Sequence, residues 1–146
     1  VTNTLSGKKF DMAFIDANHR HPWPTLDTIS LLPVMKPRAL LYHHDLELYK
    51  KREWIEGIGP KFLYDQIPED SKMAANKLEA SIFFILNRDV SKAFETALID
   101  SIHIPWTIHL EIPDHVLRST SSIAQTHWSN RLSEATLNAA EKFNTI

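Results

Sequence analysis

Two short runs of apolar residues, each ending in an acid, mark the first third of the chain. The first is FDMAFID at residues 10–16 and the second is ALLYHHD at residues 39–45. Continuous apolar runs of this length are typical of strands buried on both faces of a parallel sheet. Between them, Pro24 can begin a helix whose apolar residues recur at helical spacing until Pro33. The pattern therefore predicts a strand–helix–strand unit with parallel strands and a right-handed crossover.

The rest of the chain predicts further helices and strands. We expect helical pieces at 48–58 and 61–66, a polar loop over 65–78, a third strand at 81–86, a helix at 90–99 and, from strict alternation, a half-buried strand at 102–112. Ser122 and Gln125 have the spacing of a capping box, and the helix after them carries an apolar stripe from Ala124 to Phe143. We expect this stripe to pack on its own domain, with docking on a second subunit as the alternative.

Composition excludes several classes of function. The chain has 146 residues and a formal net charge of -2, and it lacks basic runs, which argues against a nucleic-acid surface. It has no Cys, so it cannot form disulfides, a thiolate metal site or a Cys nucleophile. The longest apolar run, residues 82–86, is far shorter than the ~20 residues of a membrane span. We therefore expect a cytoplasmic protein that contacts neither membrane nor nucleic acid.

Glycine is scarce in this sequence. Gly7, Gly57 and Gly59 are the only three, and neither a G-x-G-x-x-G motif nor a P-loop can be written with them. No glycine-rich turn is therefore expected to hold a phosphate or a nucleotide. The chain begins at Val1 with neither an initiator Met nor a signal-peptide pattern, and we expect it to be part of a longer protein.

The candidate chemistry lies where the two predicted strands end. Asp16 and Asp45 each follow a strand, and neighbouring strand backbones lie ~4.8 Å apart. Ligands of open α/β sheets bind outside the carboxyl ends of the strands, so two carboxylates could converge there on one hard divalent cation. Strand alternation places His43 on the side of Asp45, and His44 on the other side. His19, in the loop after Asp16, could ligate a metal or act as a general base.

Each of these residues also has a purely structural explanation. An acid at the end of a strand can simply form a turn or cap a helix. Either His43 or His44, taken alone, can be a hydrogen-bonded strand residue. The metal site is favoured because the same arrangement, a strand-terminal acid with a histidine near it, occurs at the ends of two strands.

Several short motifs follow one another from Phe10 to Asp45. They are Ile15-Asp16, His19, Asp27, Leu32-Pro33, Lys36-Pro37 and His44-Asp45. In order and spacing they resemble the second half of class I S-adenosylmethionine-dependent methyltransferases, in the branch related to macrocin O-methyltransferase and cephalosporin hydroxylase. In that branch a strand ends in I-D-G-x-H, a helix bears an Asp, and an "lkpGG" turn leads to a strand ending in H-D. Residues 54–67 are similar to the next helix of the family. The chain departs from the family at Ala17, which replaces a Gly, and at Arg38-Ala39, which replaces the Gly-Gly turn.

The resemblance implies an α/β fold and an activity. Residues 1–115 would form the C-terminal half of a Rossmann-like methyltransferase domain, a partial sheet with flanking helices, and residues 116–146 an appended amphipathic C-terminal helix. The activity would be methyl transfer from S-adenosylmethionine to a hydroxyl of a small molecule or sugar. The glycine-rich half that binds the donor is absent from these residues.

The resemblance also implies roles for individual residues. In metal-dependent relatives such as catechol O-methyltransferase, acids at the ends of these strands bind Mg²⁺. Asp16, Asp45 and His44 are accordingly the expected metal ligands, and His19 and His44 the expected catalytic residues. Asp16 and Ala17 are expected to contact S-adenosylmethionine.

Two other functions remain open at this stage. The chain could be a non-catalytic half-Rossmann module kept for assembly in a larger multidomain protein. It could instead be a metal-dependent hydrolase or hydroxylase-like enzyme that uses the same acids and histidines without a methyl donor. The expected partner is a small-molecule or sugar acceptor, and a homo-oligomer through the C-terminal helix is the further alternative.

Overall fold

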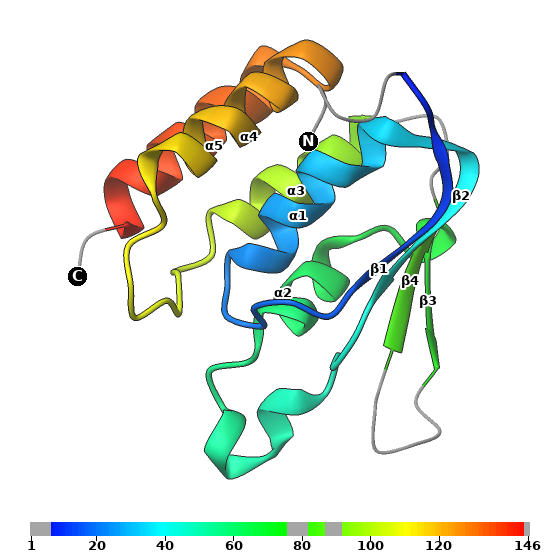
Figure 1. Cartoon of the computed structure of the whole chain (residues 1–146). Helices are drawn as coiled ribbons and strands as arrows, with labels where there is room; N and C mark the ends of the chain where they lie inside the picture. The colour runs from blue at the N-terminus through cyan, green and yellow to red at the C-terminus, as the bar shows by residue number, and fades with distance from the viewer. Residues whose placement is uncertain (1–6, 76–81, 87–91, 145–146) are drawn as a thin grey trace.

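The computed structural model describes residues 7–75, 82–86 and 92–144, and it shows a mixed α/β fold (Figure 1). One four-stranded sheet has the order β1-β2-β4-β3. Its strands are β1 (Phe10–Ile15), β2 (Met35–His43), β3 (Lys72–Ala75) and β4 (Ile82–Leu86). The pair β1 and β2 is parallel, whereas β4 runs antiparallel to both β2 and β3. The predicted parallel strand–helix–strand unit is confirmed.

In the part of the chain that the structure describes, five α-helices accompany the sheet. They are α1 (Trp23–Leu31), α2 (Gly59–Gln66), α3 (Lys92–Ile102), α4 (Asp114–His127) and α5 (Asn130–Phe143). Four 3-10 turns lie between them: η1 (Leu32–Val34), η2 (Leu48–Lys50), η3 (Arg52–Trp54) and η4 (Glu69–Ser71). Figure 1 shows α1, α2 and α3 on one side of the sheet, and α4 with α5 forming a hairpin outside them. Among the described residues, none of the helices is both long and apolar enough to cross a membrane.

The core lies between the sheet and the helix layer. Leu41 of β2 and Phe83 of β4 are fully buried there against Leu63 of α2 and Leu98 of α3. On the opposite face of β1, Met12 and other apolar side chains are exposed, so the expectation of strands buried on both faces is wrong for this part of the chain. The reason is that the helices of the described residues all pack on one face.

Two further predictions are wrong. Residues 102–112 form no strand, because α3 extends to Ile102 and the chain then continues as an irregular segment. The alternation arises because some apolar side chains of this segment, such as Trp106 and Ile112, pack into a second core with α5. The predicted loop over 65–78 contains strand β3, which is only four residues long and pairs with β4.

The C-terminal stripe belongs to two helices rather than one. The helix is interrupted at Trp128, which follows the last residue of α4. The Ser129 side chain then caps α5 by accepting a hydrogen bond from the Leu132 amide over 3.2 Å. Ser122 lies inside α4, so the predicted capping box is wrong. Packing of the stripe on its own domain is confirmed, because α5 contacts α3 and α4 contacts α1. Trp128 also donates a hydrogen bond to the Ile29 carbonyl of α1 over 3.1 Å.

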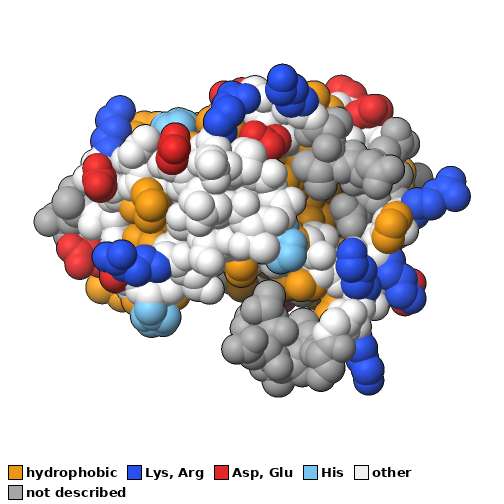
Figure 2. Space-filling model, turned by 90° about the horizontal axis from the view of Figure 1, so that it is seen from above, with side chains coloured by type: hydrophobic (Ala, Val, Ile, Leu, Met, Phe, Trp, Pro, Cys, Tyr) orange, Lys and Arg blue, Asp and Glu red, His pale blue; other side chains and the backbone are white. Residues whose placement is uncertain are grey.

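Acidic and basic side chains are both spread over the face seen in Figure 2, with hydrophobic side chains showing between them. This distribution matches the small net charge of -2.

Candidate metal centre

Four side chains converge where β1 and β2 end: Asp16, His19, His44 and Asp45. Each offers one ligand atom, and these atoms all lie within 4.8 Å of one another. The His19 Nε2 atom lies 3.6 Å from Asp16 Oδ1 and 3.4 Å from Asp45 Oδ2. The His44 Nδ1 atom lies 3.5 Å from Asp16 Oδ1 and 3.2 Å from Asp45 Oδ1. The structure thus brings together the three expected metal ligands and His19, for which the sequence left a ligand role and a base role open.

The parallel register explains why these residues meet. Ile15 pairs with His43, so the next residues, Asp16 and His44, leave the sheet side by side at the same edge. The His44 amide donates a hydrogen bond to the Ile15 carbonyl over 3.0 Å, which extends the ladder by one residue. The end of both strands at one edge is what the sequence pattern predicted.

Asp45 reaches the cluster through an unusual backbone conformation. Its φ is +58°, in the left-handed region that non-glycine residues rarely adopt. This turn breaks the strand alternation, so Asp45 joins His44 and not His43. The expectation that His43 and Asp45 would share a side is therefore wrong. Strained backbone of this kind is found at functional sites more often than elsewhere.

His43 is a hydrogen-bonded strand residue in the core, which is the structural alternative that the sequence left open for it. Its ring is 1% exposed and stacks on Phe83 with 4.9 Å between ring centroids. Thr28 donates its hydroxyl hydrogen to the Pro24 carbonyl, so it accepts a hydrogen bond from His43 Nε2 over 2.9 Å. Burial, with a smaller contribution from His19, lowers the pKa of His43 from 6.5 to about 3. His43 is therefore a neutral hydrogen-bond donor in the core.

The two histidines of the cluster carry buried nitrogen atoms that lack hydrogen bonds. His19 Nε2 and His44 Nδ1 are both inaccessible to solvent and have no hydrogen-bond partner among the described residues. A buried polar atom without a partner is costly, commonly by about 1–3 kcal/mol. Since both atoms face carboxylate oxygens, a cation between them would satisfy the nitrogens and the acids together.

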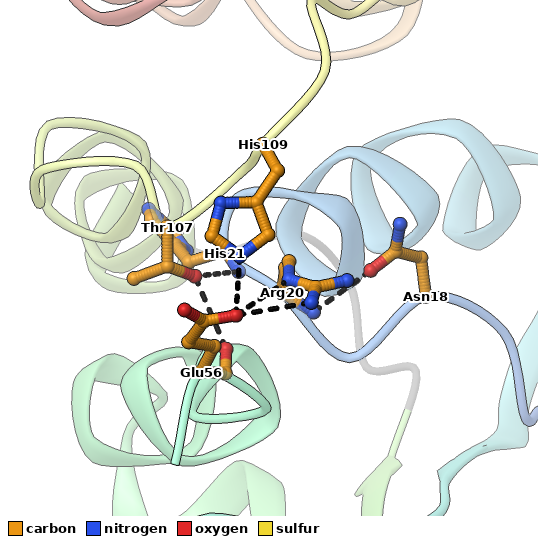
Figure 3. Close-up of polar contacts among 6 residues, drawn as sticks. All are labelled: Asn18, Arg20, His21, Glu56, Thr107 and His109. Atoms are coloured by element: carbon orange, nitrogen blue, oxygen red, sulfur yellow. Dashed lines mark hydrogen bonds and ion pairs between the residues drawn. The ribbon is translucent and has the colours of Figure 1, made fainter. Parts of the chain in front are cut away.

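The loop that carries His19 is held at its backbone. The Gly59 amide, at the start of α2, donates a hydrogen bond to the His19 carbonyl over 2.9 Å. Within the loop, the Asn18 side chain accepts a hydrogen bond from the Arg20 amide over 3.0 Å. The Arg20 guanidinium then donates to Glu56 Oε2 through Nε at 3.2 Å and through Nη2 at 3.0 Å (Figure 3).

A segment far along the chain also holds the loop that carries His19. The His21 amide donates to the Thr107 hydroxyl over 2.9 Å, and that hydroxyl donates to the Glu56 carbonyl over 3.2 Å (Figure 3). His109 contacts the Glu56 carboxylate from the same segment. Hydrogen bonds from Arg20, and next from His109, lower the pKa of Glu56. Sequence reasoning missed these partners because contacts between residues so far apart leave no periodic signal in the sequence.

An open pocket of about 350 Å³ adjoins the cluster. It lies between the loop after β1 and the turns η2 and η3, and its lining includes His19, Arg20, Glu53, Trp54 and Glu56. Trp54 is 56% exposed, so its ring is free to contact a ligand. Because His19 belongs to both the cluster and the pocket, a molecule bound here would contact one residue of the cluster.

Ala17 also lines this pocket, directly after Asp16. The expected contact of Asp16 and Ala17 with S-adenosylmethionine stays a prediction, as do the catalytic roles of His19 and His44. No protein-family model, curated protein or solved structure significantly matches the chain.

Proposed function

We propose that this chain forms the metal-binding and acceptor-binding part of a Rossmann-like, S-adenosylmethionine-dependent methyltransferase that acts on a hydroxyl group. The single observation that carries the proposal is the convergence of Asp16, Asp45 and two histidines at the carboxyl ends of neighbouring parallel strands, beside an open pocket. Ligands of doubly wound α/β sheets bind at this edge. An antiparallel strand in an otherwise parallel sheet, such as β4, is common in these folds.

The pocket supplies the groups that an acceptor would need. A cation held beside it would orient a hydroxyl and lower its pKa, which favours attack on a methyl group. The exposed Trp54 ring offers an apolar face for a planar or sugar ring. Glu53 and Glu56 can accept hydrogen bonds from other hydroxyls of the same molecule. These features support a polyhydroxylated or aromatic acceptor of small size.

The two roles proposed for the histidines compete with each other. A nitrogen that ligates a cation has no lone pair left to take up a proton. His19 Nε2 and His44 Nδ1 both face the carboxylates, so either atom is a ligand or a base, but not both. We assign the ligand role to both atoms in the loaded site.

The methyl donor needs groups that this chain does not supply by itself. The three glycines do not form a glycine-rich loop, so the methyltransferase would need such a loop from elsewhere in the protein. Asp16 and Ala17 are the residues of this chain proposed to contact the donor.

Calorimetry with S-adenosylmethionine on the protein made from its complete coding sequence tests this proposal. We expect one donor molecule to bind per chain, and metal-stimulated methyl transfer that Asp16→Asn and Asp45→Asn each abolish. Asp114→Asn, on the exposed start of α4, is the matched control and should leave transfer unchanged. Failure of the complete protein to bind the donor would contradict the methyltransferase.

The donor set itself favours a second candidate function. Two imidazoles with carboxylates occur in metal-dependent hydrolases and in hydroxylase-like metal enzymes. The clearest sign of this alternative would be metal-dependent turnover of a substrate in the absence of S-adenosylmethionine.

A further inference from the structure

The magnesium ion implied by the family resemblance does not suit the ligands found here. Magnesium is a hard cation that takes oxygen ligands and keeps several waters. Two of the four ligand atoms at this site, His19 Nε2 and His44 Nδ1, are imidazole nitrogens. Imidazole is a preferred ligand of zinc, iron, nickel and copper ions. Only Asp16 and Asp45 match the usual chemistry of magnesium.

The spacing of the ligand atoms also favours a transition metal. The nitrogen-to-oxygen distances around the cluster are 3.6 and 3.5 Å to Asp16 Oδ1, 3.4 Å to Asp45 Oδ2 and 3.2 Å to Asp45 Oδ1. With metal–ligand bonds near 2.1 Å, neighbouring ligands of a tetrahedral ion lie about 3.4 Å apart. Neighbouring ligands of an octahedral magnesium ion lie only about 2.9 Å apart. The two distances to Asp16 Oδ1 fit a tetrahedral ion, whereas Asp45 faces each histidine with a different oxygen and would bind the ion with one of them.

The state of the nitrogens adds a third argument. Neither nitrogen has a hydrogen-bond partner among the described residues, and each is closed to solvent. Magnesium would leave both buried nitrogens unsatisfied or would have to accept ligands that it disfavours. A tetrahedral ion would satisfy two nitrogens and two carboxylates at once. The hydrogen bond from the Gly59 amide to the His19 carbonyl holds the His19 backbone in place for this role.

We infer that Asp16, His19, His44 and Asp45 form a site that selects a tetrahedral first-row transition ion, with zinc as its best fit, over magnesium. The inference rests on the cation site of the proposed function, where an acceptor hydroxyl would be the fifth ligand that zinc can take on, but it does not need the methyl-transfer assignment. It changes the expected ligand set, because His19 becomes a ligand equal to the other three. It also explains why the two residues directly after β2 are a histidine and an acid, His44 and Asp45.

Calorimetry on the 146-residue chain, made without a histidine tag and stripped with a chelator, tests the inference. We expect one Zn²⁺ per chain and affinity for Zn²⁺ at least about a hundredfold above that for Mg²⁺. Co²⁺ serves as a second probe, because a tetrahedral site gives it strong visible absorption and an octahedral site gives weak absorption. His19→Ala and His44→Ala should each lower Zn²⁺ affinity at least about tenfold and weaken the Co²⁺ absorption.

Matched variants keep the outcome clear. His115→Ala, at an exposed position of α4, removes a histidine outside the cluster and should leave Zn²⁺ binding unchanged. His44→Gln retains polarity and size, and circular dichroism checks that each variant is folded. Equal affinity for Zn²⁺ and Mg²⁺, or Zn²⁺ binding kept by both cluster variants, would overturn the inference. Selective Zn²⁺ binding without donor binding in the complete protein would overturn the methyltransferase and leave this site standing.

Discussion

The Gly59 amide donates a hydrogen bond to the His19 carbonyl over 2.9 Å, and this contact joins the start of α2 to the loop that carries a metal ligand. A Cβ atom on Gly59 would lie 2.6 Å from that carbonyl oxygen and 2.9 Å from the His21 nitrogen. Both neighbours are backbone atoms, so neither can move aside as a flexible side chain would. The position of His19 therefore depends on a glycine 40 residues later in the chain.

Gly59→Ala should accordingly displace the His19 loop. We expect it to lower the free energy of unfolding by about 1–3 kcal/mol and to weaken Zn²⁺ binding. Urea titration and calorimetry measure the two effects. Gly57→Ala is the matched control, because a Cβ there would meet the Leu48 side chain at 3.0 Å and the Trp54 carbonyl at 3.1 Å, neither of which belongs to the His19 loop. Equal effects of the two substitutions on Zn²⁺ binding would contradict the claim that Gly59 positions the His19 loop.

Arg38 adopts a φ of +66°, a conformation that glycine accepts without strain. The proposed family resemblance would place the first Gly of a Gly-Gly turn at this position. Arg38→Gly should therefore raise the free energy of unfolding by about 0.5–1 kcal/mol, because relief of strain exceeds the added entropy of the unfolded chain. The same change at Arg131, in the first turn of α5, should lower it instead. Destabilisation at both positions would contradict this account of the turn.

The sequence predicted the parts of the fold that depend on local pattern. The runs ending in Asp16 and Asp45 identified two parallel strands and the edge at which the ligands meet. It could not predict that Asp45 would turn toward His44, because that turn depends on one left-handed residue. It also could not predict that the helix is interrupted at Trp128, because the apolar stripe continues across both α4 and α5.

The burial of two histidines predicts a loss of stability in acid. Burial lowers the pKa of His43 to about 3 and that of His21 to about 4, from 6.5 for both. In acid the unfolded chain binds protons on these two histidines that the folded chain does not bind. Their contribution to the free energy of unfolding is therefore complete above pH 6.5 and is lost as the pH falls toward 4 for His21 and toward 3 for His43. We expect a loss of up to about 1.4 kcal/mol per pH unit for each histidine. Urea titrations across this range would contradict the account if unfolding were independent of pH.

Asp27 should oppose this trend. Burial raises the pKa of its carboxyl from 3.8 to about 6, so its contribution is present below pH 3.8 and is lost as the pH rises through 6. Asp27→Asn should therefore raise the free energy of unfolding at pH 7 by about 1–2 kcal/mol and make the loss in acid steeper. Asp100→Asn, at an exposed position of α3, should change neither quantity. The same urea titrations measure both variants. Equal changes in the free energy of unfolding for the two would contradict the claim that the buried Asp27 carboxylate destabilises the fold at pH 7.

The exposed apolar face of β1 should make the chain self-associate at high concentration. Met12 is 61% exposed and Phe14 is 55% exposed, on a strand at the edge of the described sheet. Such strands are prone to pair with other chains. Met12→Lys should reduce association in analytical ultracentrifugation, whereas Leu137→Lys, at a 40% exposed position of α5, should not. The reverse result would favour the oligomer through the C-terminal helix.

The central claim is that one transition ion is held by two imidazoles and two carboxylates, and X-ray absorption at the zinc edge tests it most directly. For the zinc-loaded chain we expect four nitrogen or oxygen neighbours at about 2.0–2.1 Å and the outer-shell scattering of two imidazole rings. His19→Ala and His44→Ala should each remove one ring's contribution. A six-oxygen shell, or imidazole scattering that both variants retain, would contradict the claim.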